Sequence, residues 1–373
     1  MMSNKRTIDA YFSIPKAKKL RASDLMTLND ESTILTTSPK IPDDDSTTDH
    51  PTATNRGPLG YTTHASYPFP IPRLPVVLET EISGPPARPA RAIADQPDLD
   101  LLYFEPYVSR RTARQLFEFL RAELPFYRVE YDITRGPTKT HIRTPRWTTV
   151  FGLDETARFE TNLPSGSDSP SDPQSPTERV VDARTGKPVP VGHIEQKGQT
   201  GYRAIPRPIP HCLDVLRRST EAATGCRFNF CLVNYYASGA DSISFHSDDE
   251  RFLGPLPAIA SFSLGASRDF LMKHKPPKSE PGEEAKSNGK SKPPLKLPLV
   301  TGDMVLMRGR TQANWLHSIP KRSGRNEWDG GRINITFRKA LVKGGTENYY
   351  QYNVGSGPVY KWNNAAQEMR PWI

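Results

Sequence analysis

The fold of this chain is decided by one stretch, Arg332-Ile333-Asn334-Ile335-Thr336-Phe337-Arg338. Its polar and apolar residues alternate without a break, and successive side chains of a strand point to opposite faces. The stretch therefore predicts a strand whose polar face carries Arg332, Asn334, Thr336 and Arg338. An ordinary half-buried strand would alternate in the same way, with its polar face toward water. Two arginines beside an amide and a hydroxyl instead favour a ligand-binding face, because guanidinium groups bind carboxylates in bidentate geometry.

A second polar pair points to the same kind of face. Asn234 and Tyr236 are two residues apart on a predicted strand that leads toward His246. A dicarboxylate would fit between Arg332 and Arg338, and a keto acid could chelate a metal at one end. Asn234 and Tyr236 would complete the polar face around it.

The chain also contains a candidate metal site. His246-Ser247-Asp248 is its one H-x-D motif, and His317 follows a predicted strand downstream. In extended chain the histidine and the aspartate face the same side. Two histidines and one carboxylate with open positions suit non-haem Fe(II) that activates O₂. A simple His–Asp hydrogen bond in a turn is the alternative. His193-Ile194-Glu195 is a rival pair without strand context, and a zinc hydrolase would not need the two arginines.

Short strand-like runs surround these residues. We predict strands at 228–236, 258–264, 270–274, 295–300 and 304–307. Two helices should precede them, one capped by Ser109 and one from His211 to Ala223 that ends at Gly225. Helices do not alternate with the strands, which disfavours a parallel α/β sheet. The expected class is α+β, mainly β, with a jelly-roll or barrel core.

Composition divides the 373 residues into an ordered domain and flanking segments. Only 35% of the residues are hydrophobic and 37 are proline, against roughly 45–50% apolar residues, glycine included, in typical domains. We expect a disordered tail at 1–97 and one domain at 98–345. Low-complexity insertions are expected at 163–190 and 275–294. The aromatic-rich extension 346–373 should pack back on the domain, or else stack on single-stranded nucleic acid.

Charge and cysteine content narrow the function classes. The formal net charge is +9, which favours an anionic partner, nucleic acid first. Three cysteines without a CxxC motif disfavour disulfide or zinc scaffolds and fit a reducing compartment. No apolar run approaches the roughly 18 residues of a membrane helix, and the start lacks a secretory signal. We expect a monomer that does not bind membranes.

In these motifs the chain resembles the AlkB-like Fe(II)/2-oxoglutarate dioxygenases, and most closely their nuclear DNA-repair branch. The resemblance covers roughly residues 100–342 and rests on five segments in the same order: 234–236, 246–250, 259–270, His317 and the strand 332–338. It implies a double-stranded β-helix, or jelly-roll, core with two supporting helices. It further implies that Fe(II) is bound by His246, Asp248 and His317, and that 2-oxoglutarate is bound by the polar set Asn234, Tyr236, Arg332, Asn334, Thr336 and Arg338.

The implied reaction consumes O₂ and removes methyl groups oxidatively from 1-methyladenine and 3-methylcytosine in DNA, releasing formaldehyde and succinate. These lesions are cationic, and the resemblance places Glu250 and Tyr202 on the substrate side. An exposed acid and a core aromatic are their ordinary alternatives. The residues Arg135, Lys139, Arg143 and Arg146 form a cationic stretch that would hold phosphates, unless it is a solvated face.

The chain also departs from this family. The stretch 135–140 lacks the aromatic wedge of the duplex-repair enzymes, and Arg203-Ala204 follows Tyr202 where a stacking aromatic is expected. Trp147 is the candidate substitute. The preference for single-stranded DNA, duplex DNA or RNA therefore stays open. The remaining alternatives are the same chemistry on methylated RNA or a protein, and a non-catalytic scaffold that binds a clamp and nucleic acid.

The N-terminal tail carries two short motifs. Lys5-Arg6 and Lys16-Ala17-Lys18-Lys19 form a bipartite basic cluster of the nuclear-import type, or else a solvated charge run. Ile8, Tyr11 and Phe12 resemble the box by which replication and repair proteins bind a sliding clamp, although Lys5 stands where glutamine is expected. We therefore expect a nuclear protein with a possible sliding-clamp partner.

Overall fold

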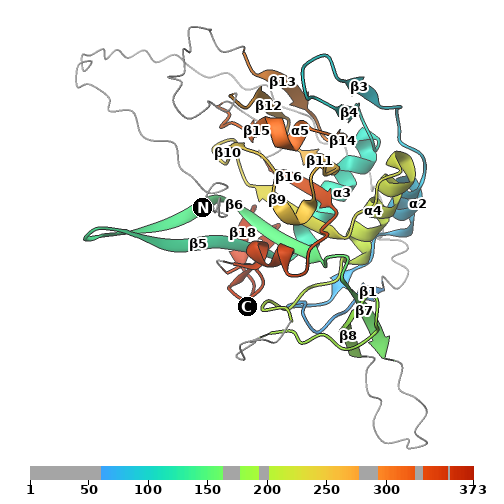
Figure 1. The fold of residues 1–373 in the computed structure, drawn as a ribbon, viewed down its shortest axis with the longest axis vertical. Helices are drawn as coiled ribbons and strands as arrows, with labels where there is room; N and C mark the ends of the chain where they lie inside the picture. The colour runs from blue at the N-terminus through green and yellow to red at the C-terminus, as the bar shows by residue number, and fades with distance from the viewer. Residues whose placement is uncertain (1–59, 163–176, 193–200, 277–292, 324–330, 352) are drawn as a thin grey trace, which may run out of the picture.

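The computed structural model describes residues 60–162, 177–192, 201–276, 293–323, 331–351 and 353–373. In this part of the chain, a ten-stranded and a four-stranded antiparallel sheet form the centre of the molecule (Figure 1). Hydrophobic side chains from both sheets share one buried cluster between them. The expected mainly β, jelly-roll core is thus confirmed.

The order in the large sheet is β18-β17-β5-β6-β9-β16-β11-β14-β4-β3, and in the small sheet β10-β15-β12-β13. The large sheet consists of β3 (Arg91–Ile93), β4 (Leu101–Phe104), β5 (Phe126–Arg135), β6 (Thr138–Gly152), β9 (Phe230–Tyr236), β11 (Ile259–Gly265), β14 (Asp303–Met307), β16 (Arg332–Arg338), β17 (Val359–Asn363) and β18 (Glu368–Pro371). The small sheet consists of β10 (Ile243–His246), β12 (Arg268–His274), β13 (Leu295–Leu299) and β15 (Trp315–Ile319).

Helices cover the other face of the large sheet. Helix α3 (Arg110–Glu123) begins at Ser109, whose hydroxyl accepts a hydrogen bond from the Thr112 backbone nitrogen at 3.1 Å. Helix α4 (His211–Thr224) ends at Gly225, which has a φ of 70°. Both helices lie where the sequence predicts them. Their apolar faces and the apolar face of β16 belong to one buried cluster.

The tail is shorter than the sequence suggests. Residues 1–59 lie outside the described residues, but 60–97 contain β1 (Tyr61–Thr62), β2 (Ile71–Pro72), α2 (Val76–Ser83) and β3. The expected boundary at residue 97 is therefore wrong. Ile71, Leu78 and Ile82 are buried among the helices. Scattered apolar residues between prolines show no period, yet they dock on a surface that the rest of the chain supplies.

The first insertion is also partly structured. β7 (Ala157–Asn162) pairs with β8 (Thr177–Asp182), and Val180 and Val181 are buried. The expectation that all of 163–190 is a low-complexity insertion is therefore wrong for its second half. Most of the 275–294 insertion lies outside the described residues.

The C-terminal extension lies against the domain. β17 pairs with β5 and β18, and the Arg121 guanidinium lies 3.9 Å from the ring centre of the buried Trp362. The short elements α5 (Thr311–Asn314), η1 (Arg251–Leu253) and η2 (Gly345–Tyr350) complete the described structure. Strands β5 and β6 extend outward as a long hairpin (Figure 1). None of the described helices is long and apolar enough to cross a membrane.

Candidate active site

A pocket lies between the two sheets, and its empty space, including open solvent, is about 790 Å³. Its floor is the polar face of β16, and its walls come from β9, β10, β11, β15 and η2. Arg332, Asn334, Thr336 and Arg338 all line it. The alternation of β16 turns its isoleucines and phenylalanine into the helix-covered core instead.

The strand register completes this polar face. In β9, Tyr236 lies opposite Arg332 and Asn234 opposite Asn334. On the other side of β16, Ser263 of β11 pairs with Asn334 and Ser261 with Thr336. The sequence-predicted polar set is therefore brought together by the sheet.

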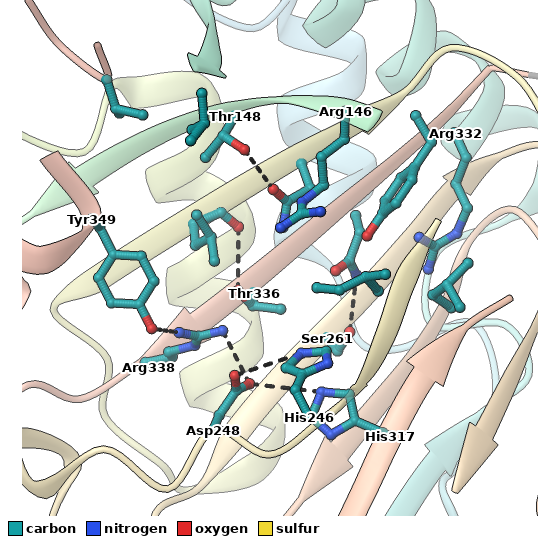
Figure 2. A pocket seen from close by; sticks show the side chains of 18 of the residues that line it. Arg146, Thr148, His246, Asp248, Ser261, His317, Arg332, Thr336, Arg338 and Tyr349 are labelled. Atoms are coloured by element: carbon teal, nitrogen blue, oxygen red, sulfur yellow. Dashed lines mark hydrogen bonds and ion pairs between the residues drawn. The ribbon is translucent and has the colours of Figure 1, made fainter. Parts of the chain in front are cut away.

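His246, Asp248 and His317 converge at one end of the pocket (Figure 2). His246 lies directly opposite His317 across the β10–β15 pair, and their ring centres are 4.2 Å apart. The Nε2 atoms of His246 and His317 lie 4.0 and 3.9 Å from the two Asp248 carboxylate oxygens. The candidate ligand atoms lie within 4.8 Å of one another, and all three residues are buried. This donor set fits the two-histidine, one-carboxylate site of non-haem Fe(II).

Burial keeps both histidines in the form that binds metals. It lowers the pKa of His246, and it lowers the pKa of His317 to about 3 with a further contribution from His246. His246 Nδ1 lies 2.8 Å from the Ser244 carbonyl oxygen, which can only accept, so Nδ1 carries the proton. Nε2 is then unprotonated and faces Asp248.

Asp248 is oriented by its neighbours. Arg338 Nη2 donates to its Oδ2 at 3.0 Å, and the Asp248 backbone nitrogen donates to Gln312 Oε1 at 2.9 Å. Arg338 also donates from Nη1 to the Tyr349 hydroxyl. Such contacts fix the direction of a metal-binding carboxylate.

Arg332 lies at the other end of the polar face. Its Nη2 donates to Ser263 Oγ at 2.9 Å, but its buried Nε and Nη1 have no acceptor in hydrogen-bonding geometry among the described residues. Burial lowers its pKa to about 10, with Tyr236 opposing the shift. Ser263 and the Tyr236 ring, 5.4 Å from the guanidinium, only partly compensate its burial. A carboxylate would fit both its charge and its remaining donors. The pocket therefore fits an oxo acid between Arg332 and the metal ligands.

A family model described as the 2OG-Fe(II) oxygenase superfamily matches residues 100–338. The chain belongs to this superfamily. The family implies Fe(II), 2-oxoglutarate and O₂ as cofactors, and the buried His–Asp–His group fits it.

Curated relatives confirm the AlkB-like resemblance of this chain. A rat "Alpha-ketoglutarate-dependent dioxygenase alkB homolog 3" is 42% identical over 142 residues, or 37% of this chain and 45% of that protein. "DNA oxidative demethylase ALKBH2" of Arabidopsis thaliana is 36% identical over 185 residues, covering 44% and 57%. The human protein of that name is 38% identical over 143 residues, covering 38% and 51%. The chain thus spans about half the length of the curated relatives it matches.

The expected substrate-side residues lie in different parts of the structure. Arg146 lines the pocket. Tyr202 does not, because it is buried in a separate cluster and its hydroxyl donates to Asp154 at 2.9 Å. Trp147 packs against the helix-side core, with Arg128 stacked 4.0 Å from its ring centre. Neither Tyr202 nor Trp147 lines the pocket, and their expected contact with the substrate stays a prediction.

The other substrate-side candidates contact a pocket residue or lie on the hairpin. Glu250 accepts a hydrogen bond from Tyr349 at 2.6 Å. On the hairpin, Lys139 pairs with Asp132 at 2.9 Å and Arg143 with Glu130 at 2.8 Å. The hairpin thus carries mixed charge. The side chain of Arg135 and the clamp-like residues Ile8, Tyr11 and Phe12 lie outside the described residues.

Sequence reasoning missed several residues of the site. Thr148 lines the pocket and donates to Asn234 Oδ1 at 2.8 Å. It stands two residues after Arg146, so strand alternation gave a usable signal. Gln312 and Tyr349 reach the site from segments without such a pattern.

Proposed function

We propose that this chain is an Fe(II)/2-oxoglutarate-dependent dioxygenase that oxidatively demethylates N-alkylated DNA bases, 1-methyladenine and 3-methylcytosine among them. The observation that carries the proposal is the polar face of one pocket, with the buried His246–Asp248–His317 group at one end and the free donors of Arg332 at the other. Relatives named as DNA oxidative demethylases support the substrate class.

Each pocket residue has a role in this proposal. His246, Asp248 and His317 hold Fe(II), and Arg332 binds the distal carboxylate of 2-oxoglutarate beside Asn234, Tyr236, Asn334 and Thr336. Arg338 orients the Asp248 carboxylate, and its expected contact with 2-oxoglutarate stays a prediction. With Fe(II) bound, one atom of O₂ would oxidise the N-methyl group to a hydroxymethyl group that leaves as formaldehyde, and the other would enter 2-oxoglutarate as it is converted to succinate and CO₂. The burial of the ligands keeps bulk water from the reacting group.

The substrate has to leave its base stack to reach this buried site. Arg146 lines the pocket, and Glu250 accepts a hydrogen bond from Tyr349, which also lines it. A cation and a carboxylate are therefore available to a flipped base. The hairpin cations Lys139 and Arg143, with Arg135, would contact phosphates. The net charge of +9 supports an anionic substrate.

The test uses a single-stranded oligonucleotide with one 3-methylcytosine, incubated with the protein, Fe(II), 2-oxoglutarate and ascorbate. Mass spectrometry should show the loss of one methylene, and the loss should vanish without 2-oxoglutarate. Succinate formation without base repair would leave the dioxygenase but overturn the DNA substrate, and methylated RNA or a protein would then be tested. If neither succinate nor the repaired base is formed, the proposed enzymatic activity is contradicted.

The tail motifs support a nuclear protein that binds a sliding clamp. The test is a pull-down with purified clamp, in which the combined change of Ile8, Tyr11 and Phe12 to alanine should abolish capture. Equal capture of the variant and the wild type would overturn the clamp proposal. Localisation of a fluorescent fusion, with and without Lys16, Lys18 and Lys19, tests nuclear import.

A further inference from the structure

One wall of the pocket comes from outside the segment that the family model matches. That match ends at residue 338, whereas η2 (Gly345–Tyr350) follows it. From η2, the side chain of Tyr349 enters the pocket and points at Arg338 (Figure 2). The C-terminal extension thus reaches the side chains next to the metal ligands.

Tyr349 joins two charged groups through its hydroxyl. It accepts a hydrogen bond from Arg338 Nη1 and donates one to Glu250 Oε1 at 2.6 Å. Arg338 in turn donates to Asp248 Oδ2 at 3.0 Å. A phenol can accept from a cation and donate to a carboxylate at once. The result is a continuous chain of hydrogen bonds from Glu250 through Tyr349 and Arg338 to Asp248.

The position of Tyr349 is fixed by packing on both sides. Its ring centre lies 5.1 Å from that of Phe230 and 6.2 Å from that of Phe252. Gly345 sits so close to Phe252 that an added Cβ would lie 2.3 Å from its side chain, so only glycine permits this approach. η2 therefore presents the phenol in a single place.

The neighbouring Tyr350 anchors the same segment on the opposite side. Its ring centre lies 5.6 Å from the guanidinium of the buried Arg207, and its hydroxyl accepts a hydrogen bond from the Arg207 backbone nitrogen at 3.3 Å. Arg207 also lies against Tyr127 and Phe151. Two adjacent tyrosines thus have different surroundings: one contacts the metal-site residues and the other contacts a structural arginine.

We propose that Tyr349 is a positioning residue for the metal centre, acting on Asp248 through Arg338. The inference rests on the proposed function for the identity of the metal ligands. With its hydroxyl in place, Arg338 is held from both ends and Asp248 keeps its direction. Without that hydroxyl, Arg338 loses an acceptor and is drawn toward the Glu250 carboxylate, away from Asp248. The extension thereby tunes metal affinity at a site whose ligands all come from the family core.

The test compares Tyr349→Phe with the matched control Tyr350→Phe. Both keep the ring and remove one hydroxyl. Binding of Co(II) alone, measured by calorimetry without oxygen or 2-oxoglutarate, should weaken about tenfold to a hundredfold in Tyr349→Phe, and should be unchanged in Tyr350→Phe. The Fe(II) concentration for half-maximal turnover should rise by the same factor. Melting temperatures of both variants report that the fold is retained.

The outcomes separate this inference from the proposed function. Wild-type affinity for Co(II) in Tyr349→Phe overturns the positioning role and leaves the proposed function standing. An equal loss in both variants also overturns it, because the effect is then one of general packing. A wild-type protein that binds no Co(II) contradicts the metal centre itself.

Discussion

The two ends of β16 carry the same residue type on the same face, yet they do different things. Arg338 donates to Asp248 and to Tyr349, whereas Arg332 donates to Ser263 and keeps Nε and Nη1 without an acceptor among the described residues. The first guanidinium is engaged with protein groups and the second is prepared for a ligand. A single strand can thus both orient a metal ligand and bind a cosubstrate, which the alternating sequence alone does not distinguish.

The largest effect should come from removing the carboxylate between the two histidines. Asp248→Ala should reduce turnover to background and abolish Co(II) binding, because the site loses one of its ligands and Arg338 loses its anionic partner. Turnover is measured with the methylated oligonucleotide and binding by calorimetry. Retained turnover would contradict the metal-site assignment. Asp269→Ala, at an exposed carboxylate paired with Lys296, is the matched control and should behave like the wild type.

The same change of arginine to lysine should have different effects at Arg332 and Arg338. Arg332→Lys should raise the KM for 2-oxoglutarate with Co(II) affinity unchanged, because a point charge cannot replace a fork. Charge-assisted hydrogen bonds contribute about 1.5–3 kcal/mol, so the rise should be roughly tenfold to a hundredfold. Arg338→Lys should raise the KM for 2-oxoglutarate and should also weaken Co(II) binding, since Asp248 loses its orienting partner. Identical effects of the two variants would remove the distinction between the two ends.

The sequence predicts the strand and not this division of roles. Strict alternation fixes which β16 side chains share a face, and the spacing of H-x-D predicts the metal pair. Both signals are local and follow from backbone geometry. Arg338 donates to Asp248, 90 residues away in the chain, and Tyr202 donates to Asp154, 48 residues away. Such contacts are set by how far-apart segments pack, and no residue period records them.

Acid should destabilise the metal end of the pocket in the metal-free protein. The pKa of His317 is about 3 in the fold, whereas an unfolded histidine titrates near pH 6.5. Between these values the unfolded chain binds a proton that the fold does not, so stability falls as the pH falls through this window. The loss is about 1.4 kcal/mol per pH unit for one proton.

Urea unfolding of EDTA-treated protein at several pH values from 7 to 4 measures this loss. His317→Gln should show a shallower dependence on pH because it cannot take up the proton. A variant slope equal to that of the wild type would show that His317 is not the source of the effect.

The smallest effects should come from a comparison of the apolar and polar faces of β16 instead of its two ends. Ile335 is fully buried against the helices, and its neighbour Thr336 lines the pocket and donates to the Leu232 carbonyl at 3.3 Å. Ile335→Val should reduce the free energy of unfolding by about 1 kcal/mol, the usual result of deleting one buried methylene, without changing the KM for 2-oxoglutarate. Thr336→Val keeps the shape of the side chain and removes its hydroxyl, so it should raise that KM. Because the residues are adjacent, any general loosening of the strand would affect both. A KM that rises equally in the two variants would mean that the strand responds as a whole, and the division between a structural and a ligand-binding face would not hold.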